Sequence, residues 1–378
     1  MSAVYFHIDV NSAYLSWTAA KRLVDGNPPD IRRIPSVIGG DESSRHGIVL
    51  AGSLPAKALG IRTGEPLIVA RRRAPGLLIL PPDYGLYAQC SQALMELLSQ
   101  FSPDVFQYSI DEAFIDMSRS VRLFGSPLTA AETIRSRVRE ELGFTVNIGI
   151  SSNRLLAKTA SDFEKPDKVH TLFPSEMEEK FWPLPIEDLF FVGKSTALRL
   201  RSLGITTIGQ LAKSDHAMIL SVFKSHGDTI WNYANGIEST PLSHNDAASK
   251  GFGNSLTLQY DVTDTAVAKH VLLSLCETVG ARIRAAGAYV SVVQVQIVDN
   301  DFRHTSRQVT LASSTNVTEK LYTCACELFD ELWDHRPIRL LGVSTGKATQ
   351  EHYEQYDLFD MQKNEKLSRL NVAGDAIR

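Results

Sequence analysis

The chain has 378 residues, of which 43% are hydrophobic and 22% are charged, an ordinary composition for a soluble protein with two or more domains. No stretch approaches about 18 apolar residues and no basic-then-apolar leader is present, so neither a membrane span nor a secretion signal is predicted. The formal net charge of −4 does not indicate a general nucleic-acid binder, although a local basic patch can still hold DNA. The four cysteines show no zinc-ligand spacing and fit a reducing cytoplasm.

The N-terminal part alternates short strands and helices. Residues 4–10 predict a core strand that carries Asp9, and residues 12–25 have the apolar spacing of a helix that Asn11 or Ser12 can cap. Two short strands are expected at 37–40 and 48–51. A short helix should follow over 55–59, with Pro55 at its start and Gly60 at its end.

The next segment places two adjacent carboxylates at the bend of a hairpin. Asp111 and Glu112 stand between apolar runs typical of strands. An isolated Asp-Glu pair is most often an ordinary acidic turn, but Asp9 can bring a third carboxylate from another strand. Like charges held together need a cation, and Mg²⁺ prefers a few carboxylates plus water and phosphate oxygens. Around this hairpin we expect strands at 77–80 and 146–150 and helices at 84–101, 130–142 and 155–162.

The C-terminal half is predicted to be helical over 170–236, with a polar linker at 237–250. Residues 252–347 then predict strand, helix, strand, strand, helix, strand. The polar tail at 348–378 carries Leu358 and Phe359, an apolar pair that a tail has little reason to expose unless a partner buries it.

Four separated motifs, in this order, resemble those of the Y-family (translesion) DNA polymerases, the group that contains bacterial polymerases IV and V. They are Asp9-x-Asn11-x-x-Tyr14; Arg45-His46-Gly47 with 48–51; Ser109-Ile110-Asp111-Glu112-Ala113; and Gly149-Ile150-Ser151-Ser152-Asn153, leading to Ala157-Lys158 and Lys165-Pro166. The resemblance runs from about residue 5 to the tail, and the ordered set is far more specific than any single motif.

The fold that the resemblance implies is α+β, a multidomain right-hand polymerase. Its parts are a ferredoxin-like palm at 1–13 and 74–168, small fingers at 14–73, a helical thumb with a helix-hairpin-helix at 169–236, a linker at 237–250, a βαββαβ little finger at 251–347 and a tail with a clamp-binding motif at 348–378.

The activity that the resemblance implies is template-directed, low-fidelity DNA synthesis past damage, with two Mg²⁺ ions assisting transfer of a deoxynucleotide to a primer 3′-OH. Asp9 and Asp111 are the implied metal-bridging residues. Glu112 completes the ion that activates the 3′-OH, and the Val10 carbonyl adds a further oxygen ligand.

The resemblance also implies how the incoming dNTP is held. Tyr14 takes the place of the steric gate against a 2′-OH, and Lys57 and Lys165 are the cations for the triphosphate. Lys57 stands where relatives usually carry arginine, Leu54 where they carry tyrosine and Ala51 where threonine is common. These departures predict fewer side-chain hydrogen bonds to the triphosphate.

Primer-template DNA and a sliding clamp are the implied macromolecular partners. Gly193 and Lys194 lie in the helix-hairpin-helix, although Phe191 replaces its first glycine and an ordinary helical turn explains the segment about as well. The implied little-finger phosphate contacts are Arg303, His304 and Arg307. Gln355, Leu358 and Phe359 are the implied contacts to the β subunit of the clamp, and folding back onto the chain's own surface is the alternative.

Two other functions remain open from the sequence. A nucleotidyl cyclase also uses carboxylates on a ferredoxin-like palm, but it would leave the C-terminal half unexplained. A catalytically weak or inactive scaffold descended from a polymerase would fit the altered Ala51, Leu54 and Phe191, while intact Asp9 and Asp111 argue against it. The lesion bypassed and the choice between the polymerase IV and V subgroups also stay open.

Overall fold

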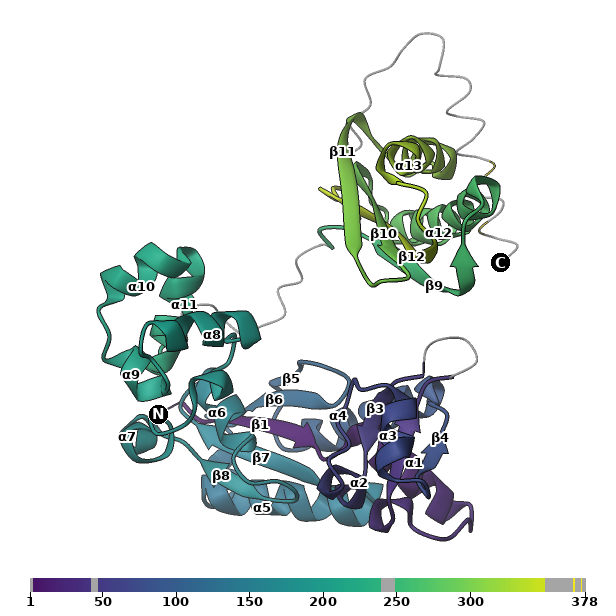
Figure 1. Ribbon diagram of the computed structural model, residues 1–378. Helices are drawn as coiled ribbons and strands as arrows, with labels where there is room; N and C mark the ends of the chain where they lie inside the picture. Colours follow the sequence, from purple (N-terminus) through teal and green to yellow (C-terminus); the bar gives the residue numbers. More distant parts are fainter. Residues whose placement is uncertain (1–2, 42–46, 239–248, 351–369, 371–374, 376–378) are drawn as a thin grey trace. The chain divides into compact units, whose positions relative to one another are not determined.

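A computed structural model of the chain describes residues 3–41, 47–238, 249–350, 370 and 375 (Figure 1). The chain divides into two compact units. The first comprises the residues up to 244 apart from 41–47, and the second comprises the rest. Across the described residues, no helix is both long enough and apolar enough to cross a membrane.

A five-stranded sheet forms the centre of the first unit. Its order is β5 (Val105–Gln107), β6 (Glu112–Asp116), β1 (Tyr5–Val10), β7 (Val146–Ser151) and β8 (Val169–Thr171). Neighbouring strands are antiparallel except β7 and β8, which are parallel. Taken in chain order, the strands β1, β5, β6 and β7 lie 2-3-1-4, the arrangement of a ferredoxin-like βαββαβ unit. The ferredoxin-like α+β arrangement predicted from the sequence is thereby confirmed.

The two faces of this sheet are covered differently. One face packs on α4 (Tyr84–Ser99), on α5 (Pro127–Arg137) with the π-helical turn Val138–Leu142, and on part of α1 (Ala13–Val24). The opposite face carries α6 (Arg154–Ser161). An added Cβ at Gly149 on β7 would lie 1.9 Å from the Ala157 carbonyl oxygen. Glycine at this position therefore lets α6 lie directly on the sheet.

A second, three-stranded sheet forms a smaller core beside α1 (Ala13–Val24). Its order is β3 (Val49–Gly52), β2 (Ser36–Gly39) and β4 (Leu78–Leu80), and it is joined by α2 (Leu54–Ala58) and α3 (Leu67–Arg73). The strand expected at 77–80, within the predicted palm range 74–168, thus pairs with β2 and not with the five-stranded sheet. The physical reason is that Leu77 and Ile79 pack with Val37 and Leu67 in a separate apolar cluster.

The predicted helical segment 170–236 begins too early, because Val169–Thr171 form β8, which pairs with β7 in the central sheet. After β8, the remainder of the first unit is helical, as predicted. It comprises α7 (Met177–Lys180), α8 (Lys194–Ser202), α9 (Ile208–Ala212), α10 (His216–Phe223) and α11 (Ser225–Ala234). These helices share one buried cluster with Leu155 and Leu156 of α6. Helix α6 therefore contributes both to the surface of the central sheet and to the helical core.

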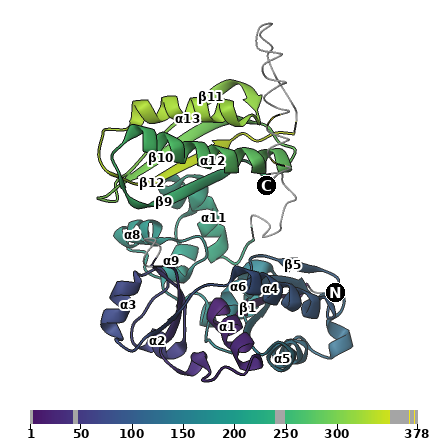
Figure 2. The same cartoon turned by 90° about the vertical axis from the view of Figure 1, so that its right-hand side faces the viewer.

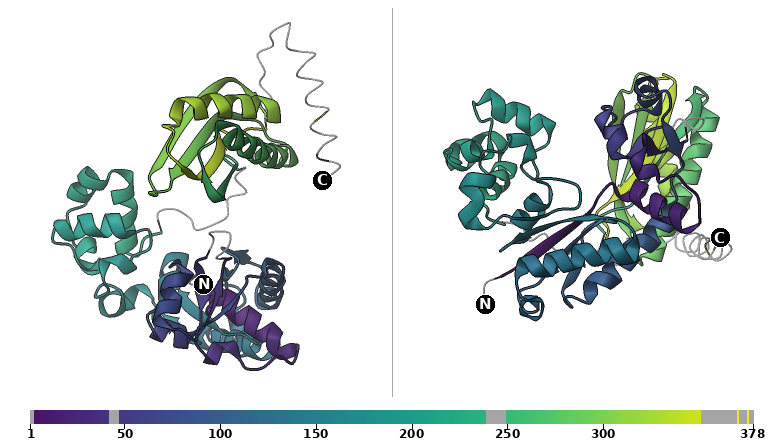
Figure 3. Two further views of the ribbon diagram at one scale, coloured as in Figure 1. Left: turned by 45° about the vertical axis from the view of Figure 1, so that its right-hand side comes forward. Right: turned by 90° about the horizontal axis from the view of Figure 1, so that it is seen from below.

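The second unit is a four-stranded antiparallel sheet with two helices on one face (Figures 2 and 3). In chain order it consists of β9 (Gly253–Val262), α12 (Thr265–Ala285), β10 (Val290–Asp299), β11 (His304–Thr315), α13 (Thr318–Leu332) and β12 (Ile338–Gly346), with the sheet order β11-β10-β12-β9. The predicted βαββαβ pattern is confirmed.

Candidate active site

Asp9 and Glu112 lie directly across from each other on the central strands β1 and β6. Alternation along β1 turns Phe6, Ile8 and Val10 into the core beneath α4 and α5, so Asp9 points to the α6 face. Asp9 is only 9% exposed. Burial, partly offset by Lys165, raises the pKa of its carboxyl to about 6.

Asp111 occupies the turn between β5 and β6. The Tyr108 and Ser109 amides both donate to the Glu112 carbonyl, at 2.9 and 3.1 Å, which closes the turn. The Ser109 hydroxyl donates to Asp111 Oδ1 at 2.7 Å. The acidic pair therefore stands at the bend of a hairpin, as its flanking apolar runs predict, and a short polar contact orients the Asp111 carboxylate.

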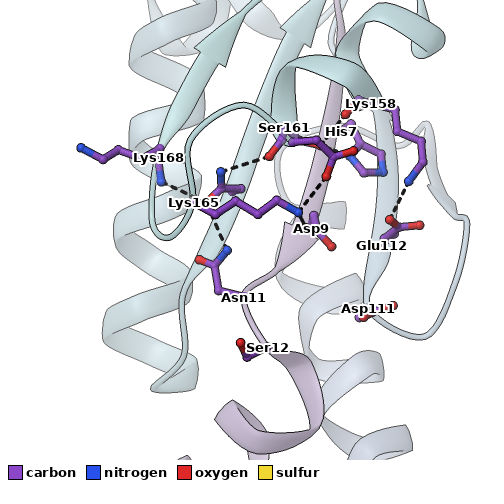
Figure 4. A network of polar contacts seen from close by, with 12 residues as sticks. His7, Asp9, Asn11, Ser12, Asp111, Glu112, Lys158, Ser161, Lys165 and Lys168 are labelled. Atoms are coloured by element: carbon purple, nitrogen blue, oxygen red, sulfur yellow. Dashed lines mark hydrogen bonds and ion pairs between the residues drawn. The ribbon is translucent and has the colours of Figure 1, made fainter. Parts of the chain in front are cut away.

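Two lysines contact the carboxylates of Glu112 and Asp9, one from α6 and one from the loop that follows it (Figure 4). Lys158 donates to Glu112 Oε1 at 2.6 Å. Lys165 contacts the Asp9 carboxylate and lies 2.8 Å from Asp162 Oδ1. Burial alone would lower the pKa of Lys165, but its two carboxylate partners outweigh burial and raise it.

The donor set has the chemistry of a magnesium site, although its oxygens are engaged with lysines. Carboxylates from adjacent strands meet at one end of the sheet, and oxygen donors of this type suit Mg²⁺. In the part of the chain that the structure describes, no three His, Cys, Asp or Glu side chains converge closely enough to hold a metal. A metal would therefore compete with Lys158 and Lys165 for Glu112 and Asp9.

Sequence reasoning missed a buried polar network behind these residues. His7, two residues before Asp9 and on the same face of β1, hydrogen-bonds through Nδ1 to the Ser161 hydroxyl at 2.7 Å. Asn11 and Asn147 bond each other at 3.1 Å and also bond backbone groups of the loop that carries Lys165. The signal available in the sequence was the period of two along β1, which puts His7, Asp9 and Asn11 on one face.

Tyr14 and Lys57 lie close to the same carboxylates. The Tyr14 ring stacks on Tyr87, with centroids 4.3 Å apart and planes 5° apart. Burial, followed by the charge of Asp111, raises the pKa of Tyr14. Lys57 on α2 donates to the Ser12 hydroxyl at 2.8 Å. Burial and then the nearby Lys165 lower the pKa of Lys57, with Asp9 opposing them.

Leu54 and Ala51, which the sequence analysis singled out in the predicted fingers, differ in exposure. Leu54, the first residue of α2, is 53% exposed. Ala51 is buried on β3, where it packs in the small cluster beside α1. Leu54 is therefore an apolar side chain that faces solvent.

The predicted helix-hairpin-helix contains Phe191, whose backbone has a conformation typical of glycine. Phe191 has φ +71°, in the left-handed region that disfavours bulky residues. Gly193 is the N-cap of α8 and makes no side-chain cap, and Lys194 is the first helical residue. Phe191 therefore has a backbone conformation that suits glycine better than an aromatic residue.

In the second unit, the predicted DNA contacts fall on two different surfaces. Arg303 lies in the turn between β10 and β11. Arg307 pairs across the sheet with Val295, which is buried under the helices, and its guanidinium lies 2.7 Å from Glu331 on α13. Arg307 therefore points to the helix-covered face. Gln355, Leu358 and Phe359 lie outside the described residues.

Comparisons with known proteins agree along the whole chain. Residues 8–162 match the impB/mucB/samB family, and residues 249–358 match the impB/mucB/samB family C-terminal domain. The DNA polymerase IV of Clostridium acetobutylicum is 46% identical, covering 100% of this chain and 95% of that protein. DNA polymerase IV 1 of Bacillus subtilis is 33% identical, covering 97% of this chain and 87% of that protein.

Solved structures show a similar fold. A Y-family DNA polymerase chimera of Dbh and Dpo4 superposes with a TM-score of 0.78 at 21% identity, covering 92% of this chain and 100% of that chain. An insertion ternary complex of Dbh DNA polymerase superposes with a TM-score of 0.61 at 21% identity, again covering 92% of this chain and 100% of that chain. At this identity the likeness concerns the fold.

Proposed function

Since the chain belongs to the impB/mucB/samB family of Y-family polymerases and is a DNA-directed DNA polymerase of the translesion type, we propose that it adds dNMP to a primer 3′-OH by two-metal phosphoryl transfer with low fidelity. The observation that carries this proposal is the meeting of Asp9 and Glu112 across β1 and β6, with Asp111 in the adjoining turn. The proposed setting is the bacterial cytoplasm.

In this proposal Asp9, Asp111 and Glu112 hold two Mg²⁺ ions, with the Val10 carbonyl as a further ligand. Bound magnesium would supply activation of the 3′-OH and stabilisation of the leaving pyrophosphate. The sheet fixes the backbone of Asp9 and Glu112, so metal binding would require movement of side chains only. Their support is rigid because β1 and β6 lie at the centre of the five-stranded sheet.

Lys57 and Lys165 are the proposed cations for the triphosphate. Both lie within electrostatic reach of Asp9, whose charge helps to raise the pKa of Lys165 and opposes the lowering of the pKa of Lys57 by burial. Lys165 is 37% exposed at its side chain and can exchange Asp9 for a phosphate oxygen. Tyr14, held by its stack on Tyr87, is the proposed barrier to a ribose 2′-OH.

Low fidelity is proposed because the fingers residues near the nucleotide supply little specific contact. Ala51 and Leu54 offer no side-chain hydrogen bond to a triphosphate, and Ala13, which precedes Tyr14, adds little bulk. A site with few polar contacts discriminates weakly between correct and incorrect substrates.

Primer extension with dNTPs and Mg²⁺ tests the proposal. Asp111→Ala should abolish extension while duplex binding persists, because a lost metal ligand removes transition-state stabilisation and not DNA affinity. Asp25→Ala, at the exposed end of α1, is the control for loss of one carboxylate. Extension by Asp111→Ala at near wild-type rate would contradict the assignment.

The competing functions receive no support from the comparisons. The relatives, which match this chain over most of their own length, are named DNA polymerase IV. A non-enzymatic scaffold is therefore not favoured. A nucleotidyl cyclase would give no primer extension and would convert a nucleoside triphosphate without template, which the same assay detects.

We also propose that Gln355, Leu358 and Phe359 dock on the β sliding clamp. A short apolar peptide binds only moderately, but attachment to a ring around DNA raises the local concentration of the polymerase at the primer end. Replacing Leu358 and Phe359 by alanine should remove stimulation by clamp and leave basal extension unaltered. Equal loss of basal activity and stability would favour packing of the tail on its own surface.

A further inference from the structure

Lys158 is a buried cation that the proposed reaction does not use. The residue is 9% exposed, and its ammonium lies 2.6 Å from Glu112 Oε1. The same ammonium lies 5.2 Å from the ring centre of Tyr108 and 5.6 Å from that of Phe190. Lys158 is therefore enclosed by one carboxylate and two aromatic rings, a setting in which charge interactions are stronger than in water.

The backbone below Lys158 fixes this position. Helix α6 lies directly on β7 because Gly149 has no side chain. The Ser161 hydroxyl donates to the Lys158 carbonyl at 2.7 Å and also contacts His7 Nδ1, which ties the end of the helix to β1. Lys158 therefore reaches Glu112 from a firmly seated helix.

Lys165 shows the contrasting arrangement. Its side chain is 37% exposed, against 11% for Lys158, and it divides its contacts between Asp9 and Asp162. Lys165 lies in a loop and can turn to a phosphate. Lys158 has no such freedom, because its aromatic neighbours and its helix hold it against Glu112.

We propose that Lys158 is a positioning residue for Glu112 and a fixed competitor of the divalent metal at that carboxylate. The inference rests on the proposed role of Glu112 as a metal ligand. The ammonium orients the carboxylate at the start of β6 and balances its charge. A divalent cation that binds Glu112 must share the carboxylate with this ammonium and experience its repulsion.

Removing the charge of Lys158 should therefore strengthen metal binding and weaken catalysis. In Lys158→Met the metal no longer meets a neighbouring cation, so Mn²⁺ should bind roughly tenfold tighter to the free protein. Glu112 also loses its anchor, so kcat for extension should fall while KM for dNTP stays near wild type. Lys165→Met should show the other pattern, a raised KM.

The experiment measures Mn²⁺ binding to the full chain without DNA, by electron paramagnetic resonance of free Mn²⁺. Lys168→Met is the matched control, because Lys168 is half exposed and pairs loosely with Glu164 at 3.7 Å; it should bind Mn²⁺ as the wild type does. Lys158→Gln, neutral but still able to donate to Glu112, is the second variant should the methionine variant fail to fold.

Glu112→Gln and the double variant that combines it with Lys158→Met test the role of Lys158 separately from the metal-ligand role of Glu112. If Lys158 acts through Glu112, the double variant binds Mn²⁺ no tighter than Glu112→Gln. Unchanged or weaker Mn²⁺ binding in folded Lys158→Met and Lys158→Gln overturns the inference. Wild-type Mn²⁺ affinity in Glu112→Gln instead overturns the proposed ligand role of Glu112, and with it the premise.

Discussion

Replacement of Gly149 by alanine should disturb the active site by displacing α6, the helix that packs against Gly149. Gly149 lies on β7 opposite His7 of β1, on the face that carries α6. An added Cβ would lie 1.9 Å from the Ala157 carbonyl oxygen and 2.5 Å from the Ser161 amide nitrogen. Both are backbone atoms, so no change of rotamer can relieve the overlap.

The size of the effect follows from these distances. Ordinary contact begins at 3.4 Å, so helix and strand must separate by roughly 1.5 Å at this point. Overpacking typically costs about 1–3 kcal/mol, and a rigid backbone contact places Gly149→Ala at about 3 kcal/mol or more. The displaced α6 also carries Lys158 away from Glu112, so extension should fall even where the protein remains folded.

The assay compares Gly149→Ala with Gly52→Ala in urea denaturation and primer extension. Gly52 is also a strand glycine of the first unit, but the nearest atom to its added Cβ is 3.6 Å away. Gly52→Ala should be neutral or slightly stabilising. Equal midpoints for the two variants, with equal extension, would refute the claim that the close approach of α6 sets the site.

Three further substitutions test individual positions. Tyr14→Ala should raise the ratio of kcat/KM for ribonucleotides to that for deoxynucleotides at least about tenfold; an unchanged ratio means that the ring only packs on Tyr87. Leu54→Tyr should lower KM for dNTP, because a hydrogen bond to a charged group contributes about 1.5–3 kcal/mol; an unchanged or higher KM means that α2 is repacked. Phe191→Gly should be more stable to urea than Phe191→Ala by about 1 kcal/mol, because only glycine lacks the Cβ strain at φ +71°; the reverse order would contradict the left-handed backbone.

The sequence predicts the carboxylate side of the site well because local patterns determine it. A buried strand ending in Asp9 and a hairpin bend at Asp111 and Glu112 are both visible as apolar runs with interruptions. Pairing of β1 with β6 is long-range, and here the resemblance to known polymerases supplied what periodicity could not. The structure then places Asp9 and Glu112 as direct cross-strand partners.

The cation side of the site was less predictable. Lys158 belongs to one of the motifs that carry the resemblance, but its contact with Glu112 depends on which face of the sheet α6 covers. That choice follows from Gly149, whose importance becomes clear only when the helix is seen against the strand. The strand at Leu78–Leu80 illustrates the same limit, since its partner β2 was set by a separate small core.

Phe191 shows how a sequence departure and a backbone conformation can be read together. The sequence shows that the first glycine of the hairpin pattern is missing, which alone suggests that the turn has changed. In the structure Phe191 has a left-handed φ, which glycine adopts far more readily than a bulky residue. The surrounding helical core, which includes Tyr233 beside the Phe191 ring, holds the conformation in place.

The charge balance of the site comes from a single stretch of chain. Buried carboxylates are unfavourable unless cations compensate them, and here the compensating lysines lie seven residues apart, one on α6 and one in the loop after it. The buried lysine stays with Glu112, and the exposed lysine is available to a phosphate. Because both depend on the seating of α6 on β7, the packing of one helix controls both the metal-binding carboxylates and the nucleotide-binding cation that we propose.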